Sequence, residues 1–299
     1  MSKDKRKDES CNVVVKRSKR NFLIYLIPLL VVVFGIGLFA YPILSNWILD
    51  KNHSKIVSKY EYEISQESKQ DIKNKWKLAK EYNESLAGDP VKDPFVLDSG
   101  YAIPDNYMDV LNVAGVMAYI EIPKIGLLCP VYHTSSEKVL EKGIGHIENS
   151  FLPIGGESTH SILTGHRGLP GAELFTRLDE MEIGDLFYIN VLDDVLCYEV
   201  NDVSVIEPYE IQKLNKVNGK DYITLITCTP YGVNTHRLLV RGEQVDYVPP
   251  EDTDVSKRGN ILGGETEQRN VILGVLIGLG IVFVLAIIFL IVSKIRKRK

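Results

Sequence analysis

Between residues 114 and 248, short runs of β-branched and aromatic residues alternate with turns rich in Gly and Pro. This pattern is typical of strands joined by short loops. Several such strands within about 135 residues predict a closed or nearly closed all-β unit. The expected strands are Val116–Ile122, Leu127–Tyr132, Ser161–Thr164, Leu186–Asn190, Val195–Val205, Tyr222–Thr227 and Leu238–Tyr247, with a short helix over Ser135–Glu141.

Two long apolar stretches flank this unit. Residues 22–48 include an uncharged run from Phe22 to about Leu44, and residues 271–293 include Val271–Val292, which is 22 residues without a charge. Each is long enough to cross ~30 Å of hydrocarbon as a helix. A cleaved signal peptide is the alternative for the first stretch, but its apolar run exceeds the usual ~7–15-residue core. Both stretches are therefore predicted to be transmembrane helices.

The charges are unevenly distributed along the 299 residues. Residues 1–20 hold eight Lys/Arg against three Asp/Glu, and residues 294–299 hold five Lys/Arg and no acid. The remainder has 22 basic and 36 acidic residues, which argues against nucleic acid as a partner. The positive-inside rule predicts that the tails at 1–21 and 294–299 are cytoplasmic. Residues of about 49–270 are then expected outside the cell membrane.

Residues 49–113 connect the first apolar stretch to the strand-rich unit. Ser54–Ala87 is predicted to be helical, as one helix or two broken ones, because its apolar residues fall close to one face. Asp89–Asp105 is rich in Asp, Gly and Pro and has no periodicity. Composition alone therefore favours a solvated linker there. Residues 249–270 are polar and predict a second linker.

A cysteine and an arginine are associated with two neighbouring strand-like runs. Cys228 follows the run Tyr222–Thr227, and Arg237 lies nine positions later in the run Thr235–Val240. If these runs are paired strands, the thiol and the guanidinium converge on one face. A thiolate is a strong nucleophile, and a permanently charged Arg beside it stabilises the thiolate and a developing oxyanion. Of the six histidines, His166 is the best placed general acid, because it stands where a buried strand opens into a loop.

The motif T-C-T-P-Y-G-V-N-T-H-R-L-L-V-R-G, with T-G-H upstream, resembles the sortases, membrane-anchored cysteine transpeptidases of Gram-positive bacteria. It is most similar to class C, the pilin polymerases, and the resemblance spans roughly Ala114–Val248. It implies a mainly β fold built on a closed eight-stranded barrel. Asp93-Pro94-Phe95 matches the class C lid, which in that family lies in the active-site groove with its acid near the Arg and its ring near the Cys.

The resemblance also implies the reaction. Cys228 attacks a Leu-Pro-X-Thr-Gly-like sorting signal, His166 protonates the departing amine, and Arg237 binds the substrate or the oxyanion. A lysine amine of a pilin then resolves the thioester, with a peptidoglycan precursor as the alternative acceptor. Residues expected to support the site or line its groove are Thr164, Thr227, Thr229, Asn234 and His146, although a structural role is favoured for His146.

Three other functions stay open. The first is a housekeeping sortase that anchors surface proteins to peptidoglycan, although the second apolar stretch and Asp93-Pro94-Phe95 favour a pilin polymerase. The second is a hydrolytic cysteine peptidase, although papain-like enzymes place Cys before His. The third is a non-enzymatic adhesin or receptor ectodomain, which leaves the combination of His166, Cys228 and Arg237 unexplained.

The remaining cysteines and histidines predict no further chemistry. Cys11 lies in the basic tail, whereas Cys129 and Cys197 lie in strand-like runs and are expected to be core thiols, with a disulfide between them left open. No Cys/His spacing resembles a zinc site, and neither a metal nor a cofactor is predicted. His236 must point away from Arg237 on a strand. His133 and His160 are expected at the surface or at strand ends.

Overall fold

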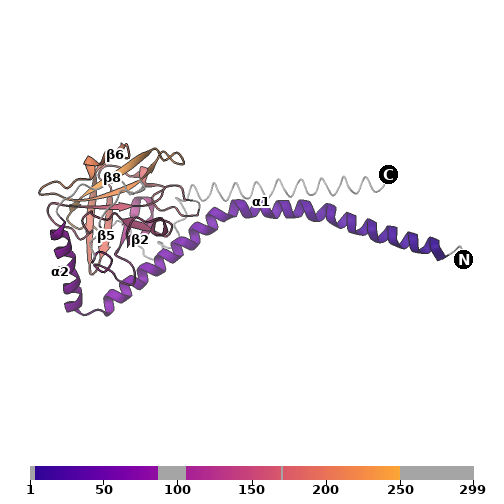
Figure 1. Cartoon of the computed structure of the whole chain (residues 1–299), viewed down its shortest axis with the longest axis horizontal. Helices are drawn as coiled ribbons and strands as arrows, with labels where there is room; N and C mark the ends of the chain where they lie inside the picture. The colour runs from indigo at the N-terminus through magenta and orange to yellow at the C-terminus, as the bar shows by residue number, and fades with distance from the viewer. Residues whose placement is uncertain (1–3, 87–105, 170, 250–299) are drawn as a thin grey trace. The chain divides into compact units, whose positions relative to one another are not determined.

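The computed structural model describes residues 4–86, 106–169 and 171–249 (Figure 1). The chain forms two compact units, Met1–Leu44 with Gly264–Lys299 and Ser45–Gly263. The predicted lid Asp93-Pro94-Phe95, residues 250–270 of the predicted linker 249–270 and the second apolar stretch lie outside the described residues. Their predictions are therefore not tested by the structure.

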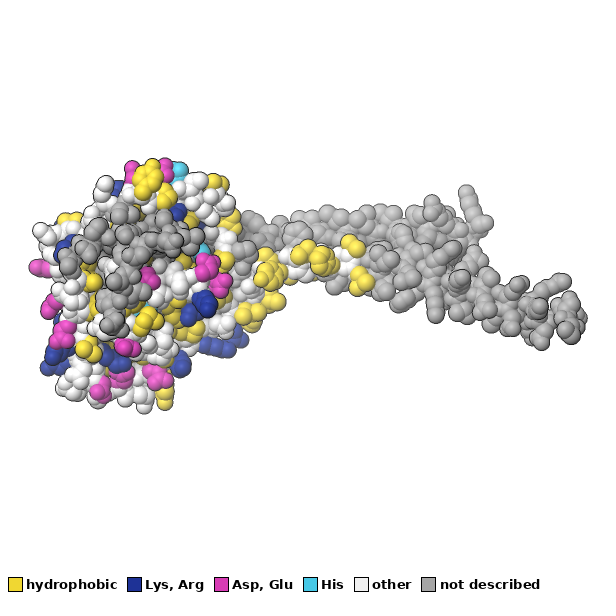
Figure 2. All heavy atoms as spheres, viewed as in Figure 1, with side chains coloured by type: hydrophobic (Ala, Val, Ile, Leu, Met, Phe, Trp, Pro, Cys, Tyr) yellow, Lys and Arg dark blue, Asp and Glu magenta, His cyan; other side chains and the backbone are white. Residues whose placement is uncertain are grey.

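Helix α1 (Asp4–Gln66) contains the first apolar stretch. Figure 2 shows exposed hydrophobic side chains along part of it. The side chains of Phe34, Leu38 and Trp47 are among the exposed ones. Among the described residues, no unbroken helix meets the length and apolarity required of a membrane span. The segments Leu30–Leu38 and Ala40–Gln66 meet the requirement together, as a pair bent by 43°. The transmembrane assignment of residues 22–48 thus stays a prediction.

The segment Ser54–Ala87 is divided between two helices, one of the two arrangements expected for it. Helix α1 ends at Gln66, and helix α2 (Lys69–Ser85) begins after Ser68, whose hydroxyl accepts the backbone N–H of Asp71 at 3.1 Å. This is the usual N-cap contact for a serine. One face of α2 packs on the core of the adjoining barrel (Figure 1). The residues of this face are Ile72, Trp76, Ala79, Tyr82 and, just beyond the helix, Leu86.

Eight strands close into a barrel in the order β1-β2-β3-β4-β7-β8-β6-β5, as the resemblance implied. Seven of them match the predicted strands to within a few residues at each end. Their bounds are β1 Ala118–Ile122, β2 Leu127–His133, β3 Ile144–His146, β4 Thr159–Thr164, β5 Leu186–Val191, β6 Asp194–Ile206, β7 Asp221–Thr229 and β8 His236–Val245.

Strand β3 was not predicted, because three residues that include a glycine carry no strand pattern of their own. It pairs in parallel with β2 and antiparallel with β4. Gly145 is required there, since a Cβ on it would lie 2.5 Å from the carbonyl oxygen of Thr134. The predicted short helix is present as α3 (Glu137–Leu140), just before β3.

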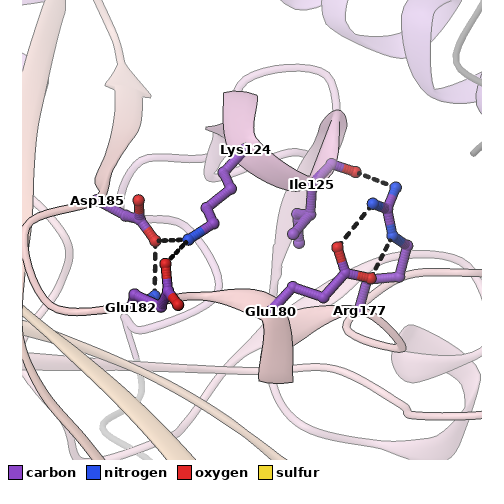
Figure 3. Close-up of polar contacts among 6 residues, drawn as sticks. All are labelled: Lys124, Ile125, Arg177, Glu180, Glu182 and Asp185. Carbon is purple, nitrogen blue, oxygen red and sulfur yellow. Dashed lines mark hydrogen bonds and ion pairs between the residues drawn. The ribbon is translucent and has the colours of Figure 1, made fainter. Parts of the chain in front are cut away.

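Ion pairs hold the long connection between β4 and β5 on the turn between β1 and β2 (Figure 3). The Lys124 ammonium, from the 3₁₀ helix η1 (Pro123–Ile125), lies 2.6 Å from Glu182 and 2.8 Å from Asp185. Arg177 binds Glu180 of the 3₁₀ helix η2 (Leu178–Glu180) and donates to the backbone carbonyl of Ile125. Exposed pairs of this kind contribute about 0–1 kcal/mol each. Their main effect is to fix the course of a connection that begins just before His166.

His133 and His160 are buried, so of the two placements expected for them the surface is excluded, whereas both do lie at or next to the end of a strand. His133 does end strand β2, but its ring is covered and its Nε2 lies 2.7 Å from the carbonyl oxygen of Val110. His160 lies inside β4, with Nε2 2.7 Å from the hydroxyl of Thr224 and Nδ1 3.1 Å from the carbonyl oxygen of Asn215. Hydrogen bonds to both ring nitrogens satisfy its polar atoms in the core.

Two buried histidines should make the fold sensitive to acid. Burial lowers the pKa of His146 and of His160 from 6.5 to about 4. Their stabilising contribution is therefore complete above the unfolded-state pKa of 6.5 and is lost as the pH falls toward 4, at a cost on the order of 2–3 kcal/mol each. We expect the urea midpoint to drop between pH 7 and pH 4.5, and to drop less in a His160→Gln variant. An equal drop in that variant would contradict the assignment.

Candidate active site

Strand pairing brings Cys228 and Arg237 together. Strands β7 and β8 are antiparallel neighbours, and Cys228 lies directly opposite Arg237 in their register. Directly opposed residues project to the same face of a sheet, with Cβ atoms about 4.5–5.5 Å apart. The Arg237 side chain is largely buried, whereas Cys228 is partly exposed. The thiol is thus open to a substrate while a cation lies beside it.

His166 reaches the same place from the other side of β7. Strands β4 and β7 are parallel, and their register ends with Thr164 beside Ile226. The contact continues past β4, because the Gly165 N–H donates to the Ile226 carbonyl at 3.3 Å and the Thr227 hydroxyl donates to the Gly165 carbonyl at 2.7 Å. Two residues beyond the end of the register, His166 and Cys228 occupy corresponding positions on these two adjacent segments. The three predicted residues therefore lie at the ends of three adjacent strands.

Backbone carbonyls orient the Arg237 guanidinium. Its Nη1 donates to the carbonyl oxygens of Asn234 at 3.3 Å and His236 at 3.1 Å. Asn234 has a positive φ of 62° and its N–H donates to the Pro230 carbonyl, so it closes the turn between β7 and β8. Asn234 contributes to the site through its backbone, which the sequence prediction did not specify.

Arg167 is a site residue that sequence reasoning missed. Its Nη1 donates to the Thr229 hydroxyl at 2.9 Å, and its Nη2 forms an ion pair with Asp179. Its side chain is largely buried. The guanidinium thus joins the segment that carries His166 to the end of the strand that carries Cys228. The only indication in the sequence is that Arg167 follows His166. That position does not show whether the side chain joins two segments of the site or is a surface charge.

Glu137 is a second residue that was missed. Its Oε1 lies 3.3 Å from Nε2 of His166. The glutamate is 72% exposed and the histidine 21% exposed. Glu137 is the first residue of α3, 29 positions before His166 in the chain. Only the folding of α3 onto the end of the barrel brings the two groups together.

His146 does not line the groove. It is buried in β3, where Nδ1 lies 2.9 Å from the Tyr107 hydroxyl and Nε2 lies 2.9 Å from the Phe151 carbonyl oxygen. These contacts agree with the structural role favoured for it. His236 projects to the face opposite Arg237 and lies 3.2 Å from Glu207, as expected on a strand. Thr164 in β4 and Thr227 in β7 are buried and do not present their hydroxyls to a substrate.

The other described cysteines are core thiols. Cys129 and Cys197 are buried and free, so the disulfide left open between them is not formed. Burial raises the pKa of the Cys129 thiol well above its ordinary value. A protonated, covered thiol is a poor nucleophile. Across the described ranges, no three His, Cys, Asp or Glu side chains gather in a way that would hold a metal ion.

Comparison with known proteins gives a consistent result. Residues 120–245 match the model of the sortase domain. The structure of sortase C-1 from Streptococcus pneumoniae is similar, with 41% identity and a TM-score of 0.62 over 65% of this chain and 100% of that chain. The pilus-related sortase C of Group B Streptococcus is 40% identical, with a TM-score of 0.60 over 64% of this chain and 97% of its own. Sortase SrtE1 of Streptomyces coelicolor is 32% identical over 146 residues, which cover 41% of its length.

Proposed function

Since this chain belongs to the sortase family of cysteine transpeptidases, we propose that it is a class C enzyme that polymerises pilins. Its substrate is a Leu-Pro-X-Thr-Gly-like sorting signal, and its acceptor is a lysine amine of a pilin subunit. The observation that carries the proposal is the convergence of Cys228, His166 and Arg237 on adjacent strand ends. The likeness to the pilus-related sortase C of Group B Streptococcus favours a pilin substrate.

The first half of the reaction uses all three residues. The Cys228 thiolate attacks the carbonyl carbon of the scissile peptide bond, and a tetrahedral oxyanion forms. Arg237, held by two backbone carbonyls, donates hydrogen bonds to the substrate or the oxyanion. His166 as imidazolium gives its proton to the departing amine, and the acyl group remains on Cys228 as a thioester.

In the second half, the lysine amine attacks the thioester. His166, now neutral, accepts a proton from the attacking amine, and the Cys228 thiolate departs as the new amide forms. Water competes with the amine for the same thioester. Transpeptidation instead of hydrolysis therefore requires a site that presents the amine to the thioester. Three threonines support the site. Thr164 in β4 and Thr227 in β7 are buried, the Thr227 hydroxyl donates to the Gly165 carbonyl, and the Thr229 hydroxyl accepts from Arg167.

Two further proposals concern regions that the structure does not describe in full. Asp93, Pro94 and Phe95 would form a lid in which the Asp93 carboxylate pairs with Arg237 and the Phe95 ring covers Cys228. Residues 22–48 and 271–293 would cross the membrane and leave both basic tails in the cytoplasm. The catalytic domain, residues 114–248 with the helical segment 49–113 before it, would then act outside the cell.

The test of the proposed function is assembly of a pilin polymer. The full chain in detergent micelles is incubated with a purified pilin subunit that carries the sorting signal. We expect a ladder of covalent multimers that survives boiling in detergent, and we expect it to disappear when the acceptor lysine of the pilin is replaced by arginine. A peptidoglycan-type amine is offered in a parallel reaction. Hydrolysed monomer alone, or transfer only to that amine, would contradict pilin polymerisation.

A further inference from the structure

Glu137 forms an ion pair with His166, the proposed general acid. The reaction proposed above gives Glu137 no role. The two atoms, Oε1 and Nε2, are 3.3 Å apart. An exposed ion pair by itself contributes little. This one differs because the His166 ring is mostly covered, and because the backbone that carries Glu137 is fixed on both sides.

The backbone of Glu137 is fixed by contacts of α3 and of the turn before it. Leu140, on the same short helix, is buried in the barrel. In the preceding turn, the N–H and the hydroxyl of Ser135 donate to the two carboxylate oxygens of Glu148 at 3.2 and 2.9 Å. The Glu137 carbonyl accepts the Glu141 N–H at 2.9 Å. These contacts fix the backbone from which the Glu137 side chain extends to the ring.

The charges around His166 indicate how the Glu137 carboxylate acts on the ring. Cys228 occupies the position on β7 that corresponds to His166, Arg237 lies opposite Cys228 on β8, and Arg167 follows His166 directly. Arg167 is paired with Asp179, and Arg237 donates to the carbonyl oxygens of Asn234 and His236. A nearby guanidinium disfavours an imidazolium, and a nearby carboxylate favours it. Glu137 supplies the opposite charge at the Nε2 atom of the ring.

We propose that Glu137 is a positioning residue, whose carboxylate holds the His166 ring in one orientation and in the protonated state from which it donates to the departing amine. This inference rests on the proposed function, because it assigns His166 the role of general acid. A carboxylate that orients a catalytic imidazole through one ring nitrogen is a recurrent arrangement in acyl-transfer enzymes. Glu137 itself touches no reacting atom.

The test is the pH dependence of peptide cleavage by the full chain in detergent micelles. The substrate is a fluorogenic peptide that contains a Leu-Pro-X-Thr-Gly sequence. In Glu137→Gln, which keeps the shape of the side chain and removes its charge, the alkaline limb of kcat should move to lower pH by about half a unit. The rate should fall roughly threefold above that limb and stay unchanged below it. Glu137→Asp should recover part of the shift.

Glu141→Gln is the matched control, since Glu141 caps the same short helix and is exposed; its profile should equal that of the wild type. If the alkaline limb of peptide cleavage moves while no pilin ladder forms, the inference stands and the proposed function fails.

Two results would overturn the inference. One is an unchanged alkaline limb of kcat in Glu137→Gln. The other is a loss of equal size at every pH with a raised KM for an amine acceptor, which would show that Glu137 recruits the cationic acceptor instead of positioning the histidine. Pilin ladders formed normally alongside either result would leave the proposed function intact.

Discussion

Replacement of Cys228 by alanine should abolish acyl transfer, with no thioester and no product detectable. The reaction needs a nucleophile that is open to substrate and whose anion is stabilised. Among the three cysteines whose side chains the structure describes, Cys228 alone is partly exposed, and it lies opposite Arg237 in the β7–β8 register. Loss of the nucleophile removes the covalent route entirely, so this change has the largest effect that we expect.

The measurement is mass spectrometry of the full chain after incubation with the sorting peptide, combined with the ladder assay. Wild type should carry one acyl group on the peptide that contains Cys228. Cys129→Ala and Cys197→Ala are the controls, and both should retain most of the activity because these thiols are packed in the core. An acyl group on Cys129 or Cys197, or activity of Cys228→Ala, would show that the nucleophile is misassigned.

His166→Ala should reduce kcat by on the order of 10²-fold or more, because a general acid cannot be replaced by a group that does not titrate. The loss should appear in kcat at saturating peptide and should not be restored at any pH between 5 and 9. The thioester-forming step, followed by stopped-flow release of the leaving group, measures the effect directly.

His236→Ala is the control for this variant. Its ring pairs with Glu207 on the outer side of the strand, so its removal should leave kcat within about twofold, as expected of a surface change. His146→Ala is expected to lose stability, since it removes a buried hydrogen-bonding group. If folded His146→Ala proved inactive and His166→Ala active, the general acid would have to be reassigned.

Most of the barrel could be predicted because its long strands carry their own pattern. Strands such as β6 and β7 are rich in β-branched and aromatic residues, so local composition and final structure agree. Strand β3 has no such pattern and exists because β2 and β4 offer it pairing partners. The burial of His160 was not predicted for a similar reason: it depends on Thr224 and Asn215, both more than 50 positions away.

Only those parts of the site that depend on local sequence could be predicted. Cys228 and Arg237 are joined by one short turn, so a hairpin reading places them together. Arg167 and Glu137 gain their positions from contacts with Thr229, Asp179 and the His166 ring. No spacing rule connects α3 to the end of β4. Such contacts depend on how connections lie over the barrel, which the strand pattern does not determine.

The closed barrel also limits how an extended peptide can be recognised. Every one of the eight strands pairs with two neighbours, so along the paired stretches the main-chain N–H and C=O groups are already used. Proteins with an open sheet edge often bind peptides by strand addition, in which main-chain hydrogen bonds supply affinity for almost any sequence. A sorting signal that meets this barrel must instead be held by side chains and connecting loops. Discrimination would then depend on the few side chains of a short motif, so unrelated extended segments of secreted proteins would pass the enzyme unbound.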